Sequence, residues 1–353
     1  MPQGVAIAIG GSPDAELGEG ATLVEVHERV GQATTFRLQY GLEIRDGDLP
    51  LLTDDRLGPG SEVSVLVPAG DSAQCLVKGP VHGQSIHLEH GGAGSTLEVT
   101  GSDTTVVMDR ENRATTWNGV RDSDVAMAIL GGYGYVPDVD PTPGLHQESG
   151  HVLAQRASDL RFLRRLATRN GYLLWVTCDA FGIETAHFKR PALEGGGNTE
   201  VIINLDSSNV DALDIEWDVE RPTSVVGAQL DLKTKSDMGG AVGATPNTIL
   251  GAEGLQDISS VTRSAHVSAP ADDSGELQAR GEGALFNADW FVTAATETTL
   301  DALGALVRAH TLVTVRGAGS RHSGDYLVAG VRHTIDSSSH RMEIELVRNG
   351  WGV

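Results

Sequence analysis

Three histidines in the first third of the chain are its nearest approach to a metal site. They are His82, His87 and His90, and imidazole nitrogens hold zinc when three or four ligands converge on one ion. On a strand, His87 and His90 would point to opposite faces because side chains alternate. We therefore expect structural or surface histidines here, and no metal.

A second group of reactive side chains lies near the C-terminus, where His322, Ser323 and Asp325 are close neighbours in sequence. Members of a hydrolytic triad meet in space and are rarely sequence neighbours, and a turn that enters a strand explains these residues better. The sequence also lacks a Gly-x-Ser-x-Gly elbow, a P-loop, a His-Glu-x-x-His pair, a strand-linked Gly-x-Gly-x-x-Gly and a calcium-binding Asp-x-Asp-x-Asp-Gly loop. We predict no catalytic residues, no cofactor-binding residues and no metal ligands, and we do not expect an enzyme.

Charge narrows the choice of partners further. The 353 residues contain 26 Lys and Arg against 48 Asp and Glu, a formal net charge of −22. This balance argues against general binding to a phosphate backbone and against attraction to an anionic membrane surface. With 44 glycines and 5% aromatic residues, the composition favours many turns and short elements over long helices.

Cysteine usage and the N-terminus bear on the compartment. Cys75 and Cys178 are the only cysteines; they do not build a disulfide framework or a Cys-x-x-Cys site, and we expect folding in a reducing compartment. The first ten residues have no basic region, and no stretch approaches the ~18 apolar residues of a membrane span. We expect a soluble protein, made in the cytoplasm without a signal peptide.

The first 115 residues predict an all-β domain. Short strand candidates, most of them separated by Gly, Asp, Pro or Ser clusters, indicate a sandwich or barrel. These candidates are residues 23–27, 61–67, 75–79, 85–89, 95–100 and 104–108.

Helices are expected in the middle of the chain. The first can be capped by Asp122 or Ser123 and stops at Gly131 and Gly132. The clearest runs from about residue 159 to 170, with Ser158 as its cap and Gly171 as its terminator. Its remaining face is crowded with arginines, which indicates either a site for anions or partner carboxylates, or a solvated face. These are Arg161, Arg164, Arg165 and Arg169.

Strands dominate the rest of the chain. Residues 172–177 and 182–188 predict a hairpin, and residues 201–205, 213–219 and 224–232 predict further strands. Residues 238–247 predict a loop or excursion, and residues 299–310 predict a last helix. A terminal hairpin follows, in which Met342, Ile344 and Leu346 alternate with charged residues after a turn at Asp336.

Several segments together resemble the late control gene D family of phage proteins, the tail hubs of contractile phages, which are related to the hub part of type VI secretion spikes and of extracellular contractile injection systems. Gln147 to Ser149 and residues 157–176 resemble the family's "ESD-x-x-FLxRLxxxxGxxxxV" segment. The other matches, in the family's order, lie at residues 97–103, at 122–125 followed by 133–134, and at 323–328 with His333.

The resemblance implies a mainly β fold with α+β insertions: two tail-tube-like antiparallel β-barrels and a mixed α/β region, assembling as a pseudo-six-fold trimer. We expect residues 1–115 to form the first barrel, 116–200 the mixed domain, 201–235 and 311–350 the second barrel, and 236–310 an insertion with a loop and a helix. Edge-to-edge joining of barrels would account for the terminal hairpin's polar face.

The same resemblance implies a structural baseplate hub that adapts a six-fold inner tube to a three-fold spike in a phage-tail-like particle. Its partners would be two further copies of the chain, the inner tube protein, baseplate proteins and a spike on a separate polypeptide, with no membrane and no specific nucleic acid. Two alternatives stay open: a tail-tip cell-wall hydrolase, which would need two convergent carboxylates, and a ligand-binding β-barrel module.

Overall fold

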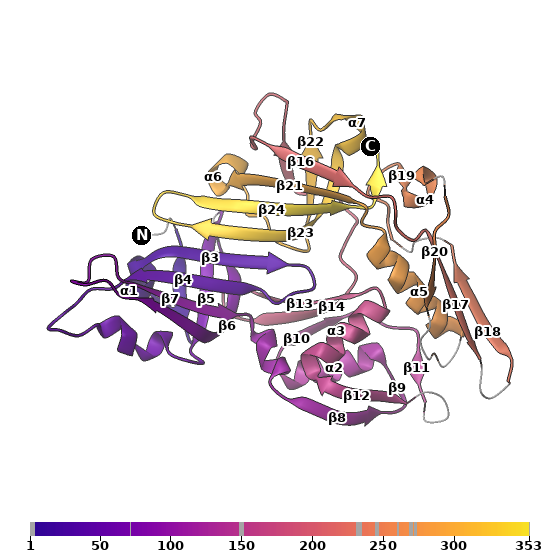
Figure 1. Ribbon diagram of the computed structural model, residues 1–353, viewed down its shortest axis with the longest axis horizontal. Helices are drawn as coiled ribbons and strands as arrows, with labels where there is room; N and C mark the ends of the chain where they lie inside the picture. Colours follow the sequence, from indigo (N-terminus) through magenta and orange to yellow (C-terminus); the bar gives the residue numbers. More distant parts are fainter. Residues whose placement is uncertain are drawn as a thin grey trace.

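The computed structural model describes residues 4–70, 72–147, 152–230, 235–243, 247–259, 261–267, 271 and 274–352. The fold is mainly β, and most strands belong to one large, largely antiparallel network (Figure 1). We divide it into a first β unit, a middle unit, a second β unit and an α/β excursion.

The first β unit surrounds a core built from alternating apolar residues. Its elements are β1 (Ala6–Ile9), β2 (Ser12–Asp14), α1 (Ala15–Gly20), β3 (Ala21–Arg29), β4 (Thr35–Gly41), η1 (Pro50–Thr53), η2 (Asp55–Leu57), β5 (Glu62–Ala69), β6 (Ser72–His87) and β7 (Thr96–Ser102). The separate candidates at 75–79 and 85–89 are one long strand, β6, which pairs first with β5 and then with β7. The sequence analysis missed β4.

The candidate strand at 104–108 is wrong. These residues lie in a 3-10 helix, η3 (Thr104–Asp109). The carboxylate of Asp103 accepts a hydrogen bond from the backbone N–H of Thr105 at 3.0 Å. Local capping by the Asp103 side chain therefore determines the conformation of this segment, although its β-branched composition favours a strand.

The middle unit contains both predicted helices. Its elements after η3 are β8 (Asn112–Trp117), β9 (Val120–Arg121), α2 (Asp122–Gly132), β10 (Val136–Val139), β11 (Leu145–His146), β12 (Leu153–Ser158), α3 (Asp159–Arg169), β13 (Leu173–Cys178) and β14 (Glu184–Lys189). The prediction of α3 is confirmed: the Ser158 hydroxyl accepts the N–H of Arg161, and Gly171 takes a φ of 66° after the helix. The β13–β14 hairpin is confirmed as well.

The arginines of α3 do not share one role. Arg161 is exposed and pairs with Asp109 at 3.1 Å, which fits a solvated face. Arg169 instead points back toward the start of α2 and pairs with the buried Asp122. Arg169 thus forms a buried ion pair that joins α3 to α2, whereas the ion pair of Arg161 lies at the surface.

Asp122 is the centre of a buried polar cluster. Its carboxylate lies 2.8 Å from His146 Nε2 and accepts hydrogen bonds from Arg169 Nε at 2.6 Å and Asn170 Nδ2 at 2.7 Å. Burial alone would raise the pKa of Asp122, but these donors and the Arg169 charge lower it from 3.8 to about 2. The cluster fastens α2 and β11 to the end of α3.

The second β unit contains the predicted terminal hairpin. Its elements are β15 (Thr199–Ile202), β16 (Leu213–Trp217), β21 (Val292–Thr299), α6 (Leu300–Leu303), β22 (Leu312–Arg316), α7 (Gly319–His322), β23 (Gly324–Ile335) and β24 (His340–Arg348). Met342, Ile344 and Leu346 are buried while the residues between them are exposed, as predicted. Asp336 Oδ1 accepts the backbone N–H groups of Ser338 and Ser339 and so fixes the turn.

The predicted helix at 299–310 is wrong beyond its first turn. The helix ends at Leu303 because Gly304 adopts a left-handed φ of 70° and caps it. His310 is a second left-handed residue, with a φ of 67°. The apolar spacing that predicted a helix belongs to an irregular connector, residues 304–311, whose buried Val307 packs into the core of the second unit.

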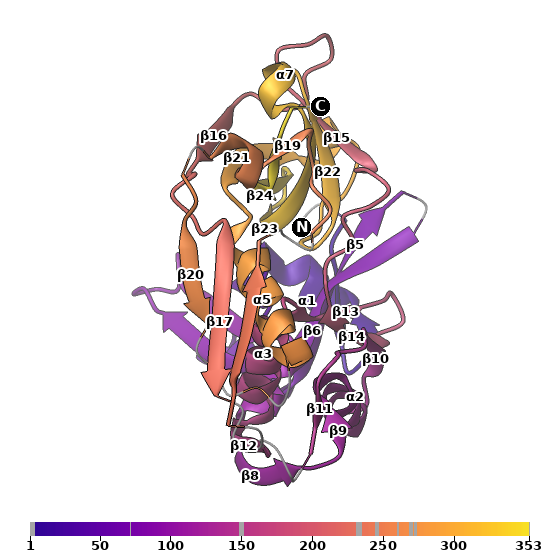
Figure 2. The same ribbon diagram turned by 90° about the vertical axis from the view of Figure 1, so that its right-hand side faces the viewer.

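The α/β excursion leaves the second unit after β16 and returns at β21. Its elements are β17 (Ser224–Leu230), β18 (Asp237–Val242), β19 (Glu253–Gly254), α4 (Leu255–Ile258), β20 (Ser264–Val267) and α5 (Ser274–Ala288), and β25 (Gly350–Trp351) pairs with β19. Figure 2 shows α5 against the small sheet β18-β17-β20. Part of the loop expected at 238–247 is β18, and residues 244–246 lie outside the described part of the chain.

Two segments therefore sit elsewhere than expected. Residues 224–230, expected in the second barrel, form β17 of the excursion, and residues 292–299, expected in the insertion, form β21 of the main sheet. The division of the chain into two barrels stays a prediction. No helix among the described residues is long and apolar enough to cross a membrane.

The Asp122 cluster yields a stability prediction. Replacement Asp122→Asn removes the negative charge that pairs with Arg169 and should lower the free energy of unfolding by about 3 kcal/mol. Because the pKa of Asp122 is depressed in the folded state, its contribution is present above about pH 4 and is lost as the pH falls toward 2. Urea titrations at pH 7 and pH 3 measure both effects, with the exposed Glu43→Gln as control. An equal loss in the two variants would contradict the prediction.

Candidate assembly surfaces and the junction between the β units

The two β units are joined by direct strand pairing. Residues 24–29 of β3 pair antiparallel with residues 330–335 of β23, and Figure 1 shows the two strands side by side. One sheet therefore runs across both units in the order β6-β7-β4-β3-β23-β24-β21-β16, and every neighbouring pair in it is antiparallel.

These eight strands are a path within the larger network, which we call the eight-stranded sheet, and the path has two ends with an unpaired edge among the described residues. Among the described residues, the distal part of β6, residues 83–87, pairs only with β7, and β16 pairs only with β21. Residues 84–87 are all exposed, with Ile86 at 47%, and Trp217 at the end of β16 is 52% exposed. Uncharged residues at 84–86 give the first edge little protection against pairing with another strand.

One face of the sheet is polar along its whole width. Arg37 forms ion pairs with Glu25 at 3.4 Å and with Glu98 at 2.9 Å. We call the β3–β23 pairing the joint between the units. Arg29 of β3 forms an ion pair across this joint with Glu345 of β24, at 3.0 Å. These ion pairs are half-exposed, so each contributes at most about 1 kcal/mol to the free energy of unfolding. Their main effect is to keep the face hydrated and unsuited to nonspecific apolar association.

A buried ion pair on the core side of the sheet links β3 to connector 304–311. Glu28 of β3 is only 4% exposed. Its carboxylate accepts the Arg308 Nε at 2.5 Å and the Ala309 backbone N–H at 2.8 Å. The other Arg308 nitrogens donate to the carbonyls of Cys75 at 2.9 Å and Leu76 at 3.1 Å. Arg308 thus ties the connector to β3 and β6 at once.

A stack of three rings joins the middle unit to the same connector, residues 304–311. The Trp175 ring of β13 lies between the rings of His187, at 4.5 Å, and of His310, at 4.4 Å. Asp138 and Thr177 hold His187 through its two ring nitrogens. Burial, with smaller contributions from His187 and Arg308, lowers the pKa of His310 to about 3, so the stacked ring is neutral.

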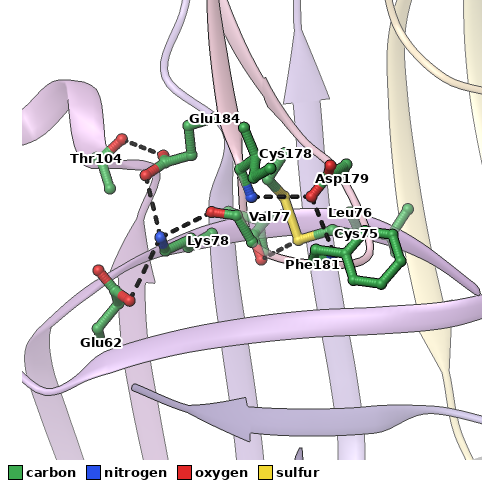
Figure 3. The surroundings of a disulfide bond; sticks show 12 residues. Glu62, Cys75, Leu76, Val77, Lys78, Thr104, Cys178, Asp179, Phe181 and Glu184 are labelled. Carbon is green, nitrogen blue, oxygen red and sulfur yellow. Dashed lines mark hydrogen bonds and ion pairs between the residues drawn. A yellow bond between two sulfur atoms is a disulfide. The ribbon is translucent and has the colours of Figure 1, made fainter. Parts of the chain in front are cut away.

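The two cysteines form a disulfide, although the sequence predicted no disulfide framework and folding in a reducing compartment. Cys75 of β6 and Cys178 of β13 are 103 residues apart and face each other at the one register position that joins these strands (Figure 3). Spacing in the sequence gave no sign of the pairing, because long-range register brings the two sulfurs together. The bond lies beside the Arg308 contacts with Cys75 and Leu76.

Two more buried histidines lie at the joint. His333 Nδ1 of β23 and His340 Nε2 of β24 are 3.0 Å apart, and within the described part of the chain neither outer ring nitrogen has a hydrogen-bond partner. Burial lowers the pKa of both rings, to about 4 for His340 and well below the ordinary value for His333. Arg308 and His27 disfavour a charge on His333, whereas Asp301 favours one on His340.

The histidines and the triad-like residues singled out from sequence lie elsewhere. His82, His87 and His90 are exposed, and the described residues contain no group of three or more side chains able to hold a metal. Asp325 accepts bonds from Thr314 and from the Gly197 backbone, and Ser323 accepts the N–H of Ala318. These are contacts of the strands β22 and β23 and of the short helix α7, where the sequence predicted a turn.

Solved structures share the arrangement just described. A 43 kDa tail protein of prophage MuSo2 from Shewanella oneidensis matches with a TM-score of 0.65 and 16% identity, covering 98% of each chain. A tail protein from Neisseria meningitidis MC58 matches with a TM-score of 0.69 and 15% identity, covering 98% of this chain and 96% of that one. The fold is therefore that of phage tail proteins.

A third solved structure extends the comparison to secretion systems. The Escherichia coli c3393 protein, a type VI secretion component described as similar to the T4 tail proteins gp27 and gp5, matches with a TM-score of 0.58 and 11% identity, covering 100% of this chain and 78% of that one. No curated protein matches the sequence. The profile of the Alg8 N-terminal domain matches residues 22–337, and the chain belongs to this family.

The buried ion pair gives a test of the joint. Replacement Glu28→Gln leaves Arg308 buried without a counter-charge and should lower the free energy of unfolding by about 3 kcal/mol. Glu345→Gln, which removes the half-exposed partner of Arg29 on the same sheet, should cost less than about 1 kcal/mol. Urea denaturation of both variants measures the difference, and similar losses would show that burial of Glu28 is unimportant.

The histidine pair gives a pH prediction. Its folded-state pKa values lie below the unfolded value of 6.5, so its contribution is complete above that pH and declines as the pH falls toward 4. Each histidine can cost up to about 1.4 kcal/mol per pH unit in this window. The double variant His333→Gln/His340→Gln should therefore show a shallower loss of thermal stability between pH 6.5 and 4.5. An unchanged slope would assign the acid sensitivity to other groups.

Proposed function

We propose that this protein is the structural baseplate hub of a contractile phage tail or injection system, a homotrimer that adapts a six-fold inner tube to a three-fold spike. The observation that carries the proposal is the eight-stranded sheet with two open ends. The similarity of the protein's fold to phage tail proteins and to a type VI secretion component supports the same role. The late control gene D resemblance found in the sequence points in the same direction.

The two open edges are unlike, which supports a head-to-tail assembly. An edge that pairs with a different edge of the next copy makes a head-to-tail contact, which closes a ring when the rotation is right and otherwise extends as a filament. Because strand direction alternates across eight strands, β16 of one copy would run antiparallel to β6 of the next. Residues 213–217 would thus meet residues 83–87 of the neighbouring copy.

The two β units explain how three copies could imitate six. Each unit contributes four consecutive strands to the sheet: β6, β7, β4 and β3 from the first, and β23, β24, β21 and β16 from the second. The contact between copies would then repeat the β3–β23 contact within a copy. Six similar contacts around a ring suit a six-fold inner tube, while the three-fold repeat of the chain suits a spike.

The polar face suits the inner surface of such a ring. Its side chains are paired across strands and carry both signs of charge, so a passing polymer would meet a hydrated wall without a large apolar patch. The proposed partners are therefore the inner tube protein, baseplate proteins and a separate spike, with no membrane and no specific nucleic acid. The particle could belong to a phage or to a domesticated injection system. No observation on the described residues favours the hydrolase or the ligand-binding module.

Engineered cross-linking tests the ring. The double variant Ser85→Cys/Asp214→Cys places one new thiol on each open edge, and both thiols lie on the polar face of the sheet. Mild oxidation should give cross-linked dimers and trimers and no larger species. Thr22→Cys/Asp214→Cys is the matched control, because Thr22 is exposed on β3 away from the open edges. Mass photometry of the wild-type chain, alone and with tube and spike proteins, should show a trimer. A chain that stays monomeric in every mixture would refute the proposal.

A further inference from the structure

We propose that the Cys75–Cys178 disulfide is a reversible redox lock. In this view the chain folds with free thiols, the bond later clamps the tip of the β13–β14 hairpin against β6, and thiols reopen it without unfolding the protein. The inference concerns the isolated chain and does not depend on the trimer.

The position of the disulfide suggests that it holds one hairpin tip in place and does not support the whole fold. Cys178 is the last residue of β13, and its pairing with Cys75 is the sole register position between β13 and β6 in the described part of the chain. The remainder of the hairpin is secured in the core of the middle unit, through Leu174, Ala186 and Phe188. Opening the bond therefore releases the hairpin tip and leaves its base in place.

Noncovalent contacts hold the same tip independently (Figure 3). Lys78 Nζ donates to the Gly182 carbonyl at 3.0 Å and lies 3.4 Å from Glu184 and 3.5 Å from Glu62. Asp179 Oδ1 accepts the backbone N–H groups of Phe181 at 2.9 Å and Ile183 at 2.8 Å, which shapes the turn. None of these contacts involves a sulfur atom, so they would hold the tip with or without the disulfide.

The two sulfurs differ in access, which sets the direction of exchange. Cys75 is 1% exposed, whereas Cys178 is half-buried and leads into a turn whose Phe181 is 89% exposed. A small thiolate would attack Cys178 Sγ and form a mixed disulfide, and the S–S electron pair would leave on Cys75 Sγ, which takes up a proton. A second thiolate then releases Cys178, so that two small thiols are oxidised to one disulfide. The Val77 carbonyl, 3.4 Å from Cys75 Sγ, can accept the new S–H.

The lock is connected to the junction of the β units. The carbonyl of Cys75 itself accepts a hydrogen bond from Arg308, and Trp175, three residues before Cys178, stacks on His310. Both contacts end on connector 304–311. Opening the bond should therefore loosen two places, the hairpin tip and the connector, while α3 and the β3–β23 pairing stay closed.

Hydrogen exchange in defined thiol buffers tests the lock. The full chain is equilibrated at several ratios of reduced to oxidised glutathione, and free thiols are alkylated and counted by mass spectrometry. We expect complete, reversible reduction without denaturant, and roughly tenfold faster exchange at residues 178–184 and 304–311 only. Reduction that requires denaturant, that unfolds the whole chain or that changes no local exchange would overturn the proposal.

Two variants separate the bond from its surroundings. Cys75→Ser/Cys178→Ser should show the fast local exchange in every buffer. Lys78→Met should exchange like the wild type when oxidised and faster than the wild type when reduced, because it removes the second tether. If oxidised Lys78→Met already matches the reduced wild type, the lysine controls the tip and the lock is refuted.

Discussion

The pairing of β3 with β23 is the constraint on which the rest of the structure depends. It joins residues near the start of the chain to residues near its end, so nearly the whole polypeptide is enclosed between the two strands. Closing so long a loop has an entropic cost, although the cost grows only slowly with length. The pairing makes the eight-stranded sheet continuous across both units, extends the polar face from one unit to the other and places the connector against β3.

The connector explains why this joint has one register. A sheet with alternating residues on both strands can slip by two positions and still bury apolar side chains. Glu28 and Arg308 oppose such a slip, because a shift would separate a buried carboxylate from the guanidinium and from the Ala309 N–H. A buried ion pair is weak support for net stability, but here it gives the pairing a single satisfied arrangement.

Local signals predicted the elements that local chemistry controls. The α3 helix has its cap, apolar stripe and terminator within a few residues, and the terminal hairpin has alternation around an Asp-Ser turn, so both were correct. The errors have distant or competing causes. The helix expected at 299–310 was misread because Gly304 ends it, and Asp103 turned a β-rich segment into η3.

Other features could not be read from the sequence because partners far along the chain create them. In α5, Gly281 and Gly283 lower helix propensity, yet a side chain at Gly283 would lie 2.6 Å from the Gly171 backbone nitrogen of the loop after α3. The glycine is therefore a requirement of close packing between distant segments. The disulfide, the Glu28–Arg308 pair and the Trp175 stack likewise follow from the register of strands that the sequence pattern does not fix.

The excursion between β16 and β21 has a consequence for how such proteins can diversify. It leaves the sheet at Trp217 and re-enters at Val292, and these two residues are directly paired neighbours. The distance between the two attachment points is therefore set by a strand pair, whatever lies between them. Evolution or an engineer could lengthen, shorten or replace this module as a graft, provided that the replacement keeps a small residue where α5 meets Gly171. The sheet would supply a constant frame, and the graft would supply what differs between one protein of this fold and another.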